Sequence, residues 1–260
     1  MAFPNIESSL RQGCNEFGLD IFVKLKCGWY SQVSPPTAPL LIDEKRVDDQ
    51  VVGFLLGGTK TLWVSFLKAY SADLSSSSSS PLYQEGDPLD TYVRKNIESL
   101  LENITSSLSL SFHIFYSWEV NYPKLLSFGR LASSSCSFFF EENTHLACHP
   151  TYGPWVSLKA FIVFPSLSES LSRPPPPACP LSSQSLEEAK QSFQEALSAP
   201  EDTEKWKLWV KVRDCVAGGP HHPFRYSEDE IAYYYGKRDF QERHRFLQNI
   251  VQKKSDGDCK

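Results

Sequence analysis

The sequence contains no stretch of about 18 apolar residues, so it predicts no helix that spans a membrane. Its first residues, Met-Ala-Phe-Pro-Asn-Ile-Glu, do not form a basic region followed by an apolar run, so we expect no secretory signal. The two glycine patterns that hold nucleotide phosphates, G-x-x-x-x-G-K and G-x-G-x-x-G, are also absent, which argues against a nucleotide fingerprint.

The cysteines and the net charge further limit the class of protein to which the chain can belong. The seven cysteines are scattered without a C-x-x-C pair, which fits reduced thiols in the cytosol better than disulfides or a structural zinc site. A net charge of −5 argues against a nucleic-acid partner. At 260 residues and 41% hydrophobic content, the chain can bury a substantial core, as one domain or as a domain with an appended helical part.

Common catalytic motifs are missing as well. The sequence shows neither a nucleophile–histidine–carboxylate order nor the zinc motif H-E-x-x-H. Cys148 and His149 are adjacent, and adjacent residues on a strand point to opposite faces of a sheet. We therefore do not expect them to form a Cys–His catalytic pair.

The most informative stretch that is present runs from His145 to Phe164. Its second half, from Trp155, is rich in β-forming residues and predicts a strand that ends at Pro165. Because this strand is almost wholly apolar, we expect both of its faces to be buried. Lys159 is its only charge. It either reaches a partner or a pocket, since an unpaired buried ammonium is costly, or extends into water at a sheet edge.

Hydrophobic periodicity and turn residues predict the remaining elements and an α+β fold. Helices are expected over 6–17, 61–70 and 89–103, strands over 19–25, 51–56 and 110–118, and a helix of small residues within 125–140. Ser185 to Glu188 resembles a capping box that opens a helical C-terminal part, and Ser227 is expected to cap a later helix. From spacing alone we expect a cytosolic protein with a buried, aromatic-lined cavity.

Three blocks of the sequence together resemble a known family. They are His149-Pro-Thr-Tyr-Gly-Pro-Trp155, Trp118-Glu-Val120, and Arg225-Tyr-Ser-Glu228 followed by Ala232-Tyr233. Their order and approximate spacing resemble the cobalamin-processing proteins of the cblC type, which act as cyanocobalamin reductases and alkylcobalamin dealkylases. The likeness extends from about Phe17 to Leu247.

The resemblance implies a flavin nitroreductase-like antiparallel sheet with flanking helices and a helical C-terminal part. It divides the chain into a cobalamin-binding core over 1–165, a Ser/Pro-rich linker over 166–184, a helical part over 185–252 that completes the cavity, and a flexible tail over 253–260.

The resemblance also implies a site for base-off cobalamin, in which the protein supplies no ligand to the cobalt. The matching positions come from a strand end, a segment along the corrin edge, an aromatic stretch and two strand positions near the macrocycle. They are Ser117, Leu125, Leu126, Ser127, Phe128, Phe139, Phe140, Glu141, Ala147 and Leu158.

A second implied site binds glutathione through three cations, for which the matching positions are Lys159, Arg213 and Arg243. These cations would hold the carboxylates of glutathione and favour its thiolate, which is the nucleophile. This chain departs from the family at two places. Lys159 stands where the family often has arginine, and Ala132 stands where it commonly has histidine.

These implied sites predict a cytoplasmic enzyme that dealkylates alkylcobalamins with glutathione and decyanates cyanocobalamin with a reduced flavin, FMN or FAD. NADP is associated with this activity, and the electron donor of the flavin stays open. The product would pass to a downstream cobalamin-trafficking protein and to methionine synthase, and the protein would be a monomer or a ligand-induced homodimer. Two alternatives stay open: a non-catalytic cobalamin chaperone, and a flavin reductase that acts on small electrophiles.

Overall fold

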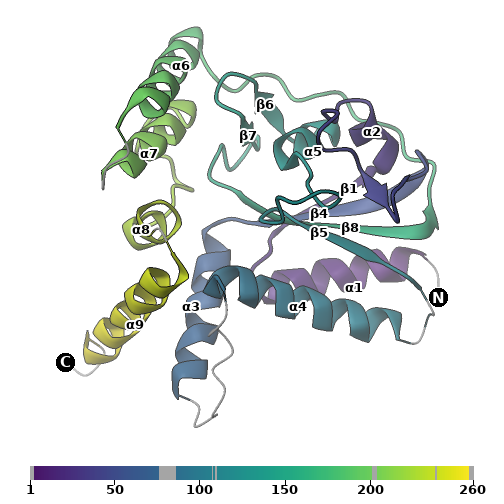
Figure 1. Cartoon of the computed structure of the whole chain (residues 1–260), viewed down its shortest axis with the longest axis horizontal. Coiled ribbons are helices and arrows are strands. Elements are labelled where there is room, and N and C mark those ends of the chain that lie inside the picture. The colour runs from purple at the N-terminus through teal and green to yellow at the C-terminus, as the bar shows by residue number, and fades with distance from the viewer. Residues whose placement is uncertain are drawn as a thin grey trace.

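The computed structural model describes residues 3–75, 86–106, 108, 110–200, 204–237 and 239–257. Within these ranges helices and strands alternate irregularly in the first two thirds of the chain, and helices alone follow (Figure 1). The elements are α1 (Phe3–Glu16), β1 (Ile21–Lys26), α2 (Cys27–Ser31), β2 (Leu41–Ile42), β3 (Lys45–Arg46), β4 (Val51–Gly58), α3 (Lys60–Ser75), α4 (Pro88–Thr105), β5 (His113–Tyr116), α5 (Phe128–Ser134), β6 (Phe139–Glu141), β7 (Leu146–Cys148), β8 (Ser157–Ser168), α6 (Ser183–Ser198), α7 (Lys205–Val216), α8 (Glu228–Gly236) and α9 (Phe240–Gly257).

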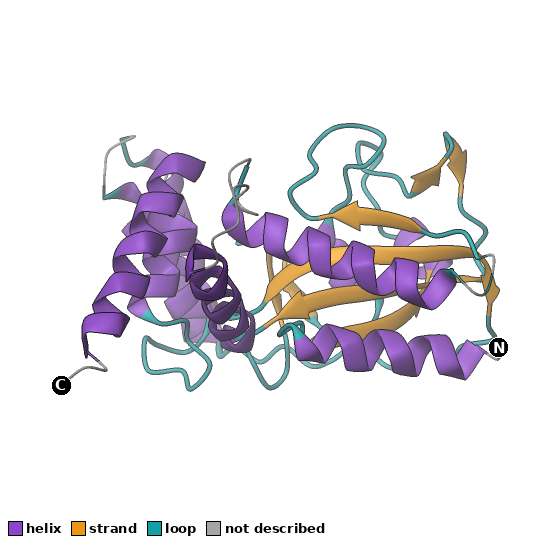
Figure 2. Cartoon of the chain, turned by 90° about the horizontal axis from the view of Figure 1, so that it is seen from below, coloured by secondary structure: helices purple, strands orange, loops and turns teal. Residues whose placement is uncertain are grey.

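The main sheet has four antiparallel strands in the order β1-β4-β8-β5. Helices α1 and α4 cover one face, and Figure 2, viewed from below, shows them side by side, running roughly along the strands. The other face carries α2, α5 and the separate β6–β7 hairpin (Figure 1). The predicted α+β class, with an antiparallel sheet, flanking helices and a helical C-terminal part, is confirmed.

Strand β8 lies inside the sheet, and its side chains enter two different cores. Ala160, Ile162 and Phe164 pack in the core beneath α1, α3 and α4. Phe161 and Val163 pack in the opposite core with residues of α2 and α5. The expectation that both faces of this strand are buried is confirmed.

Glycine permits the close approach of the two central strands. A Cβ atom added to Gly53 on β4 would lie 2.3 Å from Cζ of Phe161 on β8. The Phe161 ring cannot easily move away from such an atom, because it is part of a packed core. Gly53 therefore lets the Phe161 ring lie directly over the backbone of the neighbouring strand.

Helices α6 to α9 form a column beside one end of the sheet (Figure 1). Helices α6 and α7 pack together, and α8 follows through a loop that contains Gly218 and Gly219. Ser227 Oγ accepts a hydrogen bond from Glu230 N at 3.2 Å, so the prediction that Ser227 caps this helix is confirmed. None of the described helices is both long enough and apolar enough to cross a membrane.

Several predicted boundaries are wrong. Strand β8 continues through Pro165 to Ser168, and the register shift between Val51 and Gly53 shows an irregularity in pairing at this level. Proline has no N–H to donate to a neighbouring strand, and it is tolerated where the pairing is irregular and that hydrogen bond is not needed. The cap of α6 is Ser182, whose side chain accepts from Ser185 N, so Ser185 lies inside the helix.

The small-residue segment is helical only in α5, and its last residues form β6. Ala132 is fully buried in the core above the sheet, so at this position the small side chain serves close packing of the helix. Helix α9 extends beyond the predicted boundary at 252 to Gly257, and residues 258–260 of the predicted tail lie outside the described residues. The functional division into core, linker and helical part stays a prediction.

Candidate functional site

Lys159 reaches a partner within the molecule. Its side chain lies on β8, an inner strand, and the residue is only 5% exposed. The ammonium group donates a hydrogen bond to Asp90 Oδ1 at 3.1 Å. It also lies 5.3 Å from the ring centre of Tyr234 and 5.6 Å from that of Trp118. Of the two possibilities that the sequence left open, the structure shows the buried, paired lysine.

Arg243, from α9, meets the same end of α4. It forms an ion pair with Asp87, the residue that caps α4. Asp87 Oδ1 also accepts hydrogen bonds from Asp90 N at 2.9 Å and from Tyr233 Oη at 3.0 Å. Burial raises the pKa of the Asp90 carboxyl; the charge of Lys159 partly offsets this effect, and the negative charge of Asp87 adds to it. Two of the predicted cations thus converge on two neighbouring carboxylates.

Arg213, from α7, has a different environment. Its Nη1 donates to the backbone oxygen of Pro154 at 2.9 Å, and its Nε is buried without a hydrogen-bond partner. The guanidinium carbon lies 5.7 Å from the ring centre of Trp155 and 5.8 Å from those of Tyr226 and Tyr235. No described carboxylate forms an ion pair with Arg213, whose contacts are with aromatic rings and the Pro154 carbonyl. The buried Glu230 carboxyl is also near: burial raises its pKa, and the charge of Arg213 partly offsets this effect.

Helix α8 brings the three predicted cations together. Its consecutive tyrosines each contact one of them, with Arg243 5.1 Å from the centre of the Tyr233 ring. Tyr234 is the ring beside Lys159, and Tyr235 is one of the rings beside Arg213. The structure therefore places Lys159, Arg213 and Arg243 around one helix, although they come from three separate elements. We call these three residues the cation cluster.

Sequence reasoning missed the two carboxylates of this site. Asp87 precedes Pro88, which marks the start of a helix, and nothing in the local pattern indicates an ion pair with residues far along the chain. The tyrosine run on α8 is visible in the sequence, but its role in spacing the cations depends on tertiary packing.

The predicted cobalamin contacts lie mainly at half-buried positions on the sheet face that carries α5. Phe140 and Ala147 are opposite each other in the β6–β7 hairpin, and Ser127 N donates to Tyr30 Oη at 2.9 Å. Ser117 N donates to the backbone oxygen of Lys159 at 3.0 Å, which places this predicted contact beside the cation cluster. Leu126 is buried, whereas Leu125, Phe128, Phe139 and Leu158 are half-buried. That these residues contact a corrin ring stays a prediction.

Glu141 differs from the other predicted contacts because its carboxylate is already occupied. The residue is buried, and its oxygens accept hydrogen bonds from Asn143 Nδ2 at 2.7 Å and Thr144 N at 2.6 Å. Burial alone would raise the pKa of this carboxyl, but these hydrogen bonds outweigh it and hold the pKa below its usual value. The carboxylate of Glu141 therefore fixes the turn between β6 and β7.

Cys148 and His149 show no catalytic arrangement. Burial raises the pKa of the Cys148 thiol to about 12, so it stays protonated near neutral pH. His149 Nδ1 accepts a hydrogen bond from Thr151 N at 3.1 Å and so braces the loop that follows. Among the described residues no group of three or more His, Cys, Asp or Glu side chains is arranged to hold a metal ion.

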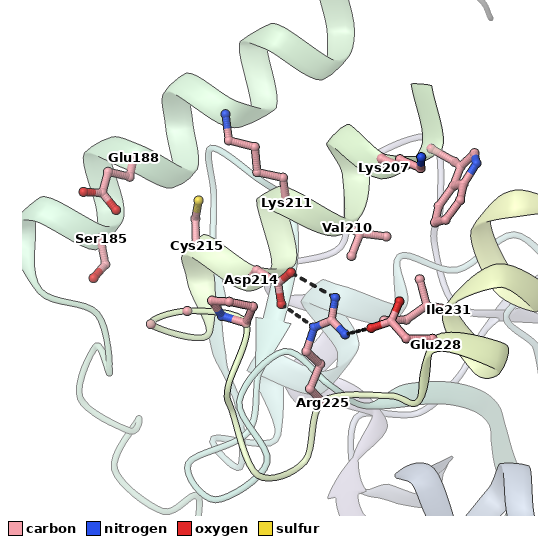
Figure 3. Close-up of a pocket in the computed structure, with 14 residues that line it drawn as sticks. Ser185, Glu188, Lys207, Val210, Lys211, Asp214, Cys215, Arg225, Glu228 and Ile231 are labelled. Atoms are coloured by element: carbon pink, nitrogen blue, oxygen red, sulfur yellow. Dashed lines mark hydrogen bonds and ion pairs between the residues drawn. The ribbon is translucent and has the colours of Figure 1, made fainter. Parts of the chain in front are cut away.

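Two cavities border helix α8, and neither is lined by a residue of the cation cluster. One, of about 580 Å³, is lined by α6, α7, the following loop and the start of α8 (Figure 3). There Arg225 donates to Asp214 and Glu228, which ties the start of α8 to α7. The other cavity, of about 730 Å³, lies at the start of α3 and is lined by Asp20, Lys60 and Glu230, among others. None of the predicted site residues lines either cavity.

Comparison with known proteins bears on the fold. No protein-family model matches the sequence, and no curated protein matches it. The architecture of a four-stranded antiparallel sheet with a helical column is nevertheless that of a solved protein. This is the C. elegans B12-trafficking protein CblC, described as a homologue of human MMACHC, which is similar over 94% of each chain with a TM-score of 0.72 and 17% sequence identity. At this identity the likeness shows a shared fold.

Proposed function

We propose that this protein processes cobalamin, removing its upper axial ligand and passing the product to a downstream cobalamin-trafficking protein and to methionine synthase in the cytoplasm. The observation that supports this most strongly is the gathering of Lys159, Arg213 and Arg243 around α8, in a fold that resembles CblC over 94% of both chains. These are the three positions that the sequence resemblance assigns to glutathione, and nothing in their spacing along the chain requires them to meet.

For alkylcobalamins the proposed co-substrate is glutathione. The cation cluster would hold its carboxylates, and neighbouring positive charge favours the thiolate form of its sulfur. The thiolate would attack the cobalt-bound alkyl carbon: a sulfur–carbon bond forms, the cobalt–carbon bond breaks, and its electron pair stays on cobalt to give cob(I)alamin. The contribution of the protein is mainly orientation, which is worth about 7–11 kcal/mol in favourable cases.

For cyanocobalamin the proposed reductant is a reduced flavin, FMN or FAD. Arg213, which forms no ion pair with a described carboxylate, would hold a flavin phosphate. A bound flavin would supply the electrons that weaken the hold of cobalt on cyanide. The half-buried apolar side chains of the 125–128 segment and the β6–β7 hairpin would exclude water from this region.

One observation favours the non-catalytic chaperone as a second candidate. Lys159 and Arg243 already have carboxylate partners within the chain, so two of the three cations are not free to bind glutathione without rearrangement. A chaperone would bind base-off cobalamin, and its spectrum would not respond to glutathione.

The experiment that tests the proposal is an absorbance spectrum of the protein mixed with methylcobalamin, before and after glutathione, in the dark and without oxygen. A shift to the base-off form, followed by cob(I)alamin only when glutathione is added, is the expected result. Arg213→Ala should keep the base-off shift and lose most of the glutathione response. A base-off shift without any glutathione response would favour the chaperone, and no shift at all would leave only a shared fold.

A further inference from the structure

Two negatively charged side chains, Asp87 and Asp90, lie beside the cation cluster. Asp90 lies 3.1 Å from Lys159, and Asp87 is paired with Arg243. Of the three cations, only Arg213 forms no ion pair with a described carboxylate; the nearby Glu230 is buried, which raises the pKa of its carboxyl to about 8. The cluster and its two acids therefore carry one net positive charge when both carboxylates are ionised, whereas the cations alone would carry three.

The two carboxylates differ in how far they are already bonded. Both oxygens of Asp87 accept hydrogen bonds, from Asp90 N and Tyr233 Oη at Oδ1 and from Arg243 at Oδ2. The side chain of Asp90 is 22% exposed and that of Asp87 is 16% exposed, while that of Lys159 is only 6% exposed. Lys159 donates to Oδ1 of Asp90, and no described residue donates a hydrogen bond to Oδ2. A ligand that reaches the cluster therefore meets the partly exposed carboxylate of Asp90 as well as the cations.

This arrangement restricts which ligand fits. A carboxylate placed beside Lys159 would also approach Asp90, and the repulsion between the two negative charges opposes binding. An ammonium group on the same ligand removes this conflict, because it can donate to Asp90 while the carboxylate faces the lysine. The α-amino acid end of a thiol such as cysteine or glutathione has both groups on one carbon.

We propose that Asp87 and Asp90 form the anionic half of the thiol site and select thiols that have a free ammonium group over otherwise identical thiols that lack it. This rests on the proposed glutathione-dependent function and specifies the chemical class of its co-substrate. In this arrangement Arg213 takes a lone carboxylate, such as that of the glycyl end of glutathione. Lys159 and Asp90 together take the zwitterionic end, and Asp87 holds Arg243 in place beside them.

A purely structural role for the two acids makes a different prediction. Asp87 caps α4, and asparagine is an equally good cap, so Asp87→Asn should leave the helix intact. Asparagine at position 90 can still accept a hydrogen bond from Lys159 through its side-chain oxygen. Each variant thus removes a charge and keeps the shape, so a structural role predicts no change in ligand selectivity.

The test compares two unreactive ligands, S-methylglutathione and its N-acetylated form, by titration calorimetry with the cobalamin-loaded protein. The wild-type protein should bind the ligand with the free ammonium about tenfold more tightly, the low end of what a charge-assisted hydrogen bond is worth. Asp90→Asn should bring this ratio close to one, and Asp87→Asn should reduce it less. Glu187→Gln on the distant helix α6, whose side chain is 79% exposed, serves as the matched loss of one acid and should leave the ratio unchanged.

The outcomes separate the two proposals. If the ratio of the two ligand affinities is the same in the wild-type protein and in Asp90→Asn, the proposed role of the carboxylates in selectivity is overturned, while the thiol site stands. Failure of the wild-type protein to bind either ligand, with the base-off cobalamin spectrum present, overturns the selectivity together with the thiol site. Failure to produce the base-off spectrum overturns the proposed function itself. In methylcobalamin dealkylation, the preference for cysteine over N-acetylcysteine should fall in the two variants as the affinity ratio does. The two thiols differ in intrinsic reactivity, but this difference is the same for every variant and cancels in the comparison.

Discussion

Strand β8 and helix α8 each direct a run of large side chains into the molecule, but against different partners. From Ala160 to Phe164 the neighbours are apolar on both faces of the sheet. From Tyr233 to Tyr235 each ring lies beside a cation. Apolar burial is non-directional and scales with area, whereas a cation held by rings and a few hydrogen bonds needs particular geometry. The sheet therefore supplies stability, and the helical column supplies specific polar contacts.

The largest expected effect is a loss of apolar packing in the sheet. Phe161→Ala should lower the free energy of unfolding by about 3–5 kcal/mol, because the ring is fully buried and its removal leaves a cavity. Urea unfolding should show a single transition moved to lower concentration. Val64→Ala, at a residue that is 67% exposed, should change the free energy by less than about 0.5 kcal/mol. Similar effects at the two positions would contradict the assignment of stability to the sheet.

The helical column should make stability depend on pH through Glu230. Burial raises the pKa of this carboxyl to about 8 from 4.5. A raised pKa means that the folded state holds the proton more tightly, so the contribution is fully present below about pH 4.5 and is lost as the pH rises through about 8. Glu230→Gln cannot lose a proton. Its stability relative to wild type should therefore increase by about 3 kcal/mol between pH 5 and pH 8, as measured by urea unfolding. A constant difference across this range would exclude a buried, neutral Glu230.

A smaller and more local effect is expected at Arg225, which joins α7 to α8. Arg225→Ala removes the ion pairs with Asp214 and Glu228 and leaves Asp214, whose side chain is 15% exposed, without its partner. We expect a loss of about 2 kcal/mol, because the pair is only partly buried. Hydrogen exchange should accelerate in α7 and α8 while amides of β4 and β8 stay protected. Arg225→Lys keeps the charge without the planar fork and should have an intermediate effect.

The smallest effect distinguishes two candidate caps of α6. Ser182→Ala should cost about 1 kcal/mol, since the Ser182 side chain accepts a hydrogen bond from Ser185 N at the helix start. Ser185→Ala should cost clearly less, because Ser185 is already inside the helix. Thermal unfolding of the two variants measures the difference, and a larger loss at Ser185 would restore it as the cap.

The same contrast explains what the sequence could predict. Strand β8 and helices α1 and α4 were expected because periodic apolar residues report local structure directly. The turn at Glu141 and the end of β8 at Ser168 were not, because side-chain hydrogen bonds and pairing irregularities override local preference. The buried charge of Lys159 indicated that a partner was needed, but Asp90 lies 69 positions away in the chain and only tertiary packing identifies it. The cation cluster itself was expected from family resemblance alone.

The contact between Gly53 and Phe161 has a consequence for how the sequence can evolve. A side chain at position 53 would collide with the ring at position 161, and a smaller residue at 161 alone would leave an empty space in the core. Either change made first lowers stability, whereas a modest enlargement at 53 combined with a smaller residue at 161 recovers part of the loss. Mutations at these two positions should therefore accumulate in pairs, and each residue limits the evolutionary freedom of the other.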